Sequence, residues 1–200
     1  MEKDSFKTIK SFCLFELKTQ KSCFIAQAFP FVNPEEFSNI HSAVKKKYFD
    51  SAHNPFAYRV GLGNVQFRFN DDGEPSGSAG KPILDAIDKY DLTDIIIFVS
   101  RYFGGVKLGV GGLKRAFFDT AEGCLQNAKI ITKYIKKKIN LEFEYFYMGS
   151  IMNFLENNGI TSIKSSFDTN VKIECEIRIS KIEDFKKKLT ELSNGKIKID

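Results

Sequence analysis

Glycines and cations share one short stretch of the sequence, RYFGGVKLGVGGLKR at residues 101–115. It contains five glycines and four cations, namely Gly104, Gly105, Gly109, Gly111, Gly112, Arg101, Lys107, Lys114 and Arg115. An apolar segment precedes it and a segment of helical periodicity follows, so we expect a loop between a strand and a helix. Backbone N–H groups freed by glycines, together with a helix start, can hold phosphate or carboxylate. The stretch therefore predicts an anion-binding loop to which the lysines and arginines attract the ligand.

Two nucleotide-binding motifs fail in this loop. A Walker loop requires Lys after its last glycine, whereas Leu113 follows Gly112 here. A dinucleotide fingerprint fits at Gly109 and Gly111 but has Lys114 where the third glycine belongs. The alternative to an anion site is a glycine-rich turn in which a strand and a helix pack tightly.

A second stretch, NDDGEPSGSAGKP at residues 70–82, contains the carboxylates Asp71, Asp72 and Glu74. They could hold Mg²⁺ or Ca²⁺, although the EF-hand spacing is absent. SGSAG approaches the G-x-S-x-G of a serine nucleophile, but Ser76 replaces the first glycine, and neither histidine is obviously placed to serve it. A third interpretation is a turn whose carboxylates orient nearby arginines and whose small residues admit a ligand. A polar turn with a helix cap is the fourth.

His53, in SAHNPFAYRVG, could donate a proton or contact a phosphate, and a surface histidine before a strand is the alternative. The cysteines lie far apart with no C-x-x-C pair, at Cys13, Cys23, Cys124 and Cys175. With only two histidines in the chain, this pattern predicts reduced cysteines and no structural zinc. We expect neither a metal nor a cofactor.

Hydrophobic periodicity predicts the elements that position these residues. In the first part we expect strands over 11–20, 22–30, 56–63, 65–70 and 94–103, and helices over 33–49, 79–90 and 111–127. The run IIIFV is typical of a central strand covered on both sides. The second part has strands within 131–148, 160–168, 170–180 and 196–200 and helices over 149–159 and 181–195. This β-α-β-β-α-β order predicts a ferredoxin-like domain at 131–200 after an α+β domain at 1–130.

Composition restricts the class of protein. The chain has 200 residues, 42% of them hydrophobic, which suits one or two globular domains. The net charge of +5 permits an anionic partner without requiring one. MEKDSFKTIK lacks the apolar core of a signal peptide, and IIIFV is too short to span a bilayer. We therefore expect a cytoplasmic protein with no membrane partner.

Three segments together resemble the YigZ/IMPACT family: AHNPFAYRVG, FNDDGEPSGSAGKPIL and VSRYFGGVKLGVGGLKRAF. The resemblance covers residues 10 to 125. The matching residues are His53, Asp71, Asp72, Glu74, Ser76, Arg101, Lys107 and the glycines of 104–112. Pro55 stands where the family usually has Cys, so a role that rests on that thiol does not carry over.

This resemblance implies a fold and a field of function. The first domain would have the β-α-β fold found in a small-subunit ribosomal protein and in ribonuclease PH. The second would be similar to the last domain of elongation factor G. Eukaryotic IMPACT proteins act in translational control by competing for an activator of the kinase that senses amino-acid starvation. The implied partners are therefore RNA, the ribosome or a translation factor.

Three functions remain open at this point. The favoured one is a translation-associated regulator that binds RNA or another phosphate-bearing ligand. Tyr102 and Phe103 could stack on bases, and the alternative is that they complete a core strand. The second is a metal-assisted enzyme acting on a phosphorylated small molecule, and whether the protein is an enzyme is left undecided. The third is a pure protein-interaction module.

Overall fold

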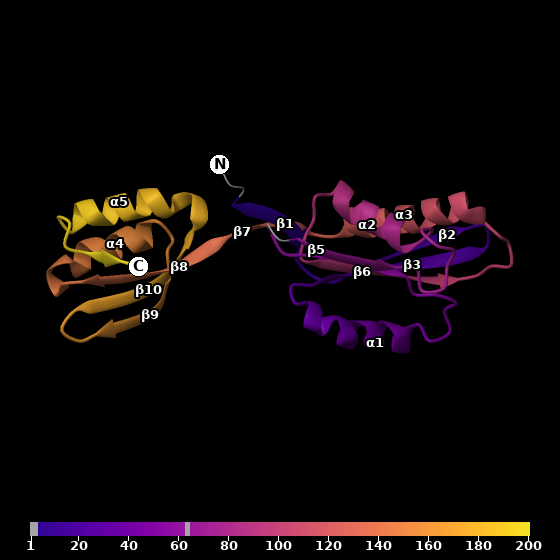
Figure 1. Ribbon diagram of the computed structural model, residues 1–200, viewed down its shortest axis with the longest axis horizontal. Helices are drawn as coiled ribbons and strands as arrows, with labels where there is room; N and C mark the ends of the chain where they lie inside the picture. Colours follow the sequence, from indigo (N-terminus) through magenta and orange to yellow (C-terminus); the bar gives the residue numbers. More distant parts are fainter. Residues whose placement is uncertain (1–3, 63–64) are drawn as a thin grey trace. The chain divides into compact units, whose positions relative to one another are not determined.

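The computed structural model describes residues 4–62 and 65–200, which form two compact units (Figure 1). One unit is Phe6–Lys133, and the other is Tyr134–Asp200 with Asp4 and Ser5. The predicted α+β class and two-domain architecture are confirmed. The chain passes between the units twice, from Ser5 to Phe6 and from Lys133 to Tyr134, whereas the sequence predicts one boundary, between 130 and 131. Gly63, the last residue of the strand predicted over 56–63, lies outside the described residues.

An antiparallel five-stranded sheet in the order β2-β3-β6-β4-β5 forms the centre of the first unit. Its strands are β2 (Cys13–Thr19), β3 (Ser22–Pro30), β4 (Phe56–Val60), β5 (Gln66–Asn70) and β6 (Ile95–Tyr102). Helix α1 (Phe37–Lys47), preceded by the 3-10 turn η1 (Pro34–Glu36), covers one face, and α2 (Gly80–Lys89) and α3 (Gly109–Asn127) cover the other (Figure 1). A separate two-stranded sheet pairs β1 (Ser5–Ile9) with β7 (Ile130–Tyr134).

Strand β6 determines where the polar residues of this unit lie. Because successive side chains of a strand point to opposite faces, Ile97 and Val99 pack into the core beneath α2 and α3, and Ile96 and Phe98 pack toward α1. The same alternation directs Arg101, at the end of β6, toward the face of α2 and α3. The buried apolar run that the sequence predicts is thus the scaffold for the candidate site.

The second unit has the predicted β-α-β-β-α-β order. Its elements are β8 (Lys136–Phe143), η2 (Tyr145–Tyr147), α4 (Met148–Asn157), β9 (Ser162–Phe167), β10 (Val171–Arg178), η3 (Ile179–Lys181), α5 (Ile182–Leu192) and β11 (Lys198–Ile199). The four strands are antiparallel in the order β11-β8-β10-β9, and both helices cover one face (Figure 1). Ile173, Cys175 and Ile177 alternate into the core under these helices, which explains the strict apolar period of β10.

No helix in residues 4–62 and 65–200 combines the length and apolar character needed to cross a membrane.

Candidate functional site

Arg101 is a buried cation held by a buried carboxylate. Its Nη1 donates hydrogen bonds to Oε1 and Oε2 of Glu74 over 2.7 and 2.8 Å, and the two residues are only 8% and 6% exposed. The guanidinium carbon lies 5.5 Å from the centre of the Phe24 ring and 5.4 Å from that of Phe103. Its Nε, however, has no hydrogen-bond partner among the described residues. A buried donor left unpaired costs about 1–3 kcal/mol, which marks this end of β6 as a place where a polar partner would be stabilising.

Asp71 organises the start of α2. Its two carboxylate oxygens accept hydrogen bonds from the backbone N–H groups of Gly77, Ala79 and Gly80, over 2.8 to 3.0 Å. The residue before α2, Ala79, has no capping side chain of its own. Asp71 therefore satisfies N–H groups that the helix cannot, and its negative charge suits the positive end of the helix dipole. Its role in ligand binding stays a prediction.

Asp72 and His53 form a second set of contacts. The carboxylate of Asp72 accepts the N–H of Asn54 over 2.8 Å and lies 3.8 Å from Nζ of Lys45. His53 Nδ1 lies 2.7 Å from the carbonyl oxygen of Asp72. Because a carbonyl only accepts, Nδ1 is the donor in this contact. Gly73 packs on this ring, since a Cβ there would lie 2.9 Å from it.

The three carboxylates therefore diverge. Asp71 faces the backbone of α2, Asp72 faces Asn54, and Glu74 faces Arg101. Within the part of the chain that the structure describes, no group of three or more His, Cys, Asp or Glu side chains could hold a metal ion. Of the two nearby serines, Ser76 is exposed, and Ser78 is fully buried with its Oγ lacking a partner among the described residues.

Most of the glycines of residues 104–112, which span the end of β6 and the start of α3, are required for different structural reasons. A Cβ on Gly104 would lie 2.0 Å from the backbone of Lys21. Only glycine at position 104 leaves room for this close approach of the two backbone segments. Gly105 and Gly109 have φ values of +85° and +70°, which L side chains rarely adopt. At Gly112 a Cβ would meet the Leu108 side chain at 3.0 Å.

Neither close packing nor a positive φ requires a glycine at position 111. A Cβ on it would meet no heavy atom within 4 Å, and its φ is not in the positive range. It stands in the first turn of α3, where no side chain caps the helix. Lys107 and Lys114 are both exposed beside this turn. Among the described residues, no side chain caps the start of α3 and no carboxylate pairs with Lys107 or Lys114, so N–H groups, open space and two cations lie together there.

Tyr102 and Phe103 differ in availability. Tyr102 donates a hydrogen bond to Oδ1 of Asp50 over 2.8 Å, and burial together with this bond raises the pKa of Tyr102 to about 12. Its ring packs against the core on the α1 side, so it completes the strand. Phe103 is 51% exposed and lies over Arg101, so its ring remains accessible for stacking.

Several residues that contribute to the candidate site are not indicated by the sequence. Phe24, which lies under Arg101, comes from β3 and looks like any other core residue in the sequence. A buried polar chain also runs beneath the site, in which Gln27 donates to Ser100 and Ser100 donates to Asn54. The available signal is that Gln27 and Ser100 interrupt otherwise apolar strands.

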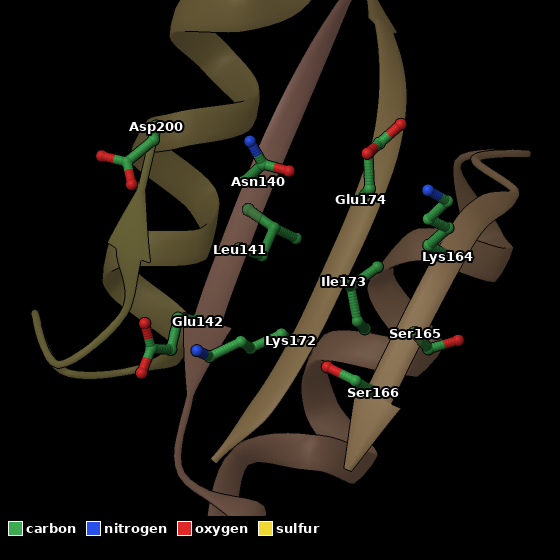
Figure 2. Close-up of a pocket in the computed structure, with 10 residues that line it drawn as sticks. All are labelled: Asn140, Leu141, Glu142, Lys164, Ser165, Ser166, Lys172, Ile173, Glu174 and Asp200. Carbon is green, nitrogen blue, oxygen red and sulfur yellow. The ribbon is translucent and has the colours of Figure 1, made fainter. Parts of the chain in front are cut away.

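A hollow of about 460 Å³ lies on the open face of the sheet in the second unit (Figure 2). Lys172 lies opposite Glu142 in the register, and Glu174 lies opposite Lys164. Opposite charges in facing positions of neighbouring strands offset each other. This face is therefore a charge-paired surface, without the excess of cations found beside α3.

Comparison with known proteins places the chain in a family. The Impact N-terminal domain profile matches residues 20–125, and the profile named Domain of unknown function (DUF1949) matches residues 141–196. The IMPACT family member YvyE of Bacillus subtilis (strain 168) is 32% identical over 192 residues, covering 96% of this chain and 88% of that protein. The IMPACT family member YigZ of Escherichia coli (strain K12) is 29% identical over 159 residues, covering 78% of each.

A solved structure described as "Crystal structure of an hypothetical protein" superposes with a TM-score of 0.69 at 25% identity, covering 98% of this chain and 97% of that one. Its agreement extends over both units of the fold. With an Impact N-terminal domain over more than half of its length, followed by a DUF1949 domain, this chain belongs to the IMPACT family.

Proposed function

We propose that this protein is a translation-associated regulator that binds the phosphates of RNA at the loop between β6 and α3. Gly111 is the observation that carries the proposal. Glycine in a helix costs about 0.5–1 kcal/mol relative to alanine. Neither packing nor backbone conformation requires that cost at Gly111. Close approach of a ligand to the first turn of α3 accounts for it.

Charge and stacking support the same ligand. The uncapped N–H groups of the first turn of α3 suit a phosphate oxygen, and exposed Lys107 and Lys114 add positive charge beside them. Phe103 supplies an accessible ring on which a base can stack. Glu74 neutralises Arg101, so this arginine positions Phe103 and the end of β6 rather than acting as a free cation. The translational role comes from the family resemblance.

A binding titration tests this proposal. We expect the protein to bind fluorescein-labelled oligouridine with an affinity that falls steeply with salt. Each phosphate contact on a single strand contributes a slope of about −0.7 in log affinity against log salt. The variant Lys107→Gln/Lys114→Gln should reduce the slope by about 1.4. The control Lys46→Gln/Lys47→Gln removes the same charge from α1, on the other face of the sheet, and should leave the slope nearly unchanged.

The variant Gly111→Ala separates binding from folding. We expect amide exchange in α3 to stay as slow as in the unaltered protein or to become slower, because alanine favours the helix. Its affinity for the RNA should fall about tenfold, equivalent to about 1.4 kcal/mol, because the new methyl group occupies the approach to the N–H groups. Unchanged RNA affinity in this variant would remove RNA from the loop. Competition by inorganic pyrophosphate at low concentration would instead indicate a small phosphorylated ligand.

We do not propose a metal-assisted enzyme, because Asp71, Asp72 and Glu74 point to three different partners instead of to one ion.

A further inference from the structure

The free edge of β5 is unusually open to another chain. Among the strands of residues 4–62 and 65–200, β5 is the last of its sheet and pairs on one side only, with β4, in a regular register from Phe56–Asn70 to Val60–Gln66. All five of its residues are exposed. It contains neither proline nor a bulge, two features that commonly protect such edges. An edge of this kind presents unpaired N–H and C=O groups to which a further strand can bond.

A groove of about 480 Å³ runs between this edge and α2, and we call it the β5 groove. Its lining includes Phe67, Phe69, Leu84, Arg59, Lys81 and Asp88. Phe69 lies opposite Ala57, which is buried in the core beneath α2. Phe67, two residues away on the same strand, shares its face, so both phenylalanines lie on the α2 side of the sheet. Phe67 is nevertheless 61% exposed and Phe69 39%. Two large aromatic side chains beside a free strand edge are typical of an interaction surface.

Charges around the groove indicate the chemistry of the partner. The cations of its lining are already paired, Arg59 with Asp88 over 3.1 Å and Lys81 with Asp85. Arg68, between the two phenylalanines, points to the opposite face and lies 5.4 Å from the Phe37 ring. Among residues 4–62 and 65–200, no carboxylate forms an ion pair with Arg68. A carboxylate on an added strand would complement it.

The pairing with a second copy of this chain that matches the two phenylalanines is unfavourable. An antiparallel two-fold pairing of β5 with β5 that sets Phe67 opposite Phe69 must be centred on Arg68. It would place the two Arg68 side chains directly opposite each other, and like charges in that position are destabilising. A different strand, with a carboxylate at the central position, keeps the aromatic contacts and removes the repulsion.

We propose that the β5 groove binds an extended segment of a partner protein, which adds to β5 as a sixth strand through backbone hydrogen bonds and carries an acidic residue between two apolar ones. The apolar side chains pack beside Phe67 and Phe69, and the acidic side chain lies opposite Arg68. This inference does not depend on RNA binding at α3.

Synthetic peptides of defined pattern test the proposal on the full-length protein. One labelled peptide alternates valine with glutamate, and its match alternates valine with lysine. We expect anisotropy to report binding of the glutamate peptide and a preference for it over the lysine peptide. Phe67→Ser should weaken that binding about tenfold or more, and because Phe67 is largely exposed the variant should remain folded. Arg68→Glu should reverse the preference toward the lysine peptide.

The other edge of the same sheet supplies a matched control. Leu14 on β2 is 44% exposed, and Leu14→Ser should leave peptide binding unchanged. The proposal is overturned if the glutamate peptide fails to bind below about 1 mM, the range of the weakest specific affinities. It is also overturned if Phe67→Ser and Arg68→Glu bind both peptides as the unaltered protein does. A concentration-dependent dimer that Phe67→Ser abolishes would assign the groove to a second copy instead.

Discussion

Replacing Glu74 with alanine is expected to destabilise the first unit by about 3–5 kcal/mol. The substitution leaves Arg101 92% buried without its only carboxylate partner among the described residues, and an uncompensated buried charge is strongly unfavourable. Because the chain has two units, one urea transition need not report on either alone. Hydrogen exchange of the slowest amides in β6 measures the free energy of unfolding of this unit directly.

A double substitution provides the control for this prediction. In Glu74→Leu/Arg101→Met both charges are gone, and apolar replacements for a buried pair are often neutral or stabilising. We expect this variant to recover most of the lost stability while still binding RNA more weakly, because Phe103 loses the guanidinium beneath it. If Glu74→Ala alone changed β6 exchange by less than about 1 kcal/mol, the typical value for an exposed pair, Arg101 would have to be hydrated in solution.

Replacing Gly104 with alanine is expected to cost about 3 kcal/mol or more, the upper range for overpacking. The new Cβ would lie 2.0 Å from both C and O of Lys21 and 2.6 Å from N of Ser22. These are backbone atoms of the turn between β2 and β3, so no side-chain rotation can relieve the overlap. Lys21 already has a φ of +67°, which limits how the turn can shift.

Exchange of the amides of β3 and β6 measures this loss, because Ser22 begins β3 and Gly104 follows β6. Gly111→Ala is the matched substitution, because it adds the same methyl group in open space, seven residues along the chain in the first turn of α3. Equal stability of the two alanine variants would contradict the tight approach of Gly104 to Lys21.

Local pattern predicted the elements of this fold well and its distant pairings poorly. The apolar run of β6 and the strict alternation of β10 identify a covered strand and a half-covered one, and both are present. β1 is missed because its five residues lie in a charged segment with no strong period. Its partner β7 begins more than a hundred residues later, and such pairing leaves no local trace.

The same limit applies to the candidate site. The sequence indicated that carboxylates near residue 72 orient an arginine, but it could not select among three of them. Selection depends on the turn at Asp72 and Gly73, whose φ values of +46° and +89° rotate the chain so that Glu74 reaches Arg101. Phe24 reaches the same guanidinium from a strand that pairs with β6 across the sheet. Neither the backbone rotation at this turn nor the cross-strand pairing can be inferred from the spacing of residues along the chain.

The alternation of side chains along β6 also restricts which insertions and deletions this strand can tolerate. Arg101 and Tyr102 are neighbours in the chain yet serve opposite faces of the sheet, one bonded to Glu74 and the other to Asp50. Insertion or deletion of a single codon upstream within β6 would exchange the faces of every residue beyond it. Arginine would then enter the aromatic core beneath α1, and tyrosine would meet the buried carboxylate. This segment should therefore tolerate substitutions more easily than insertions or deletions.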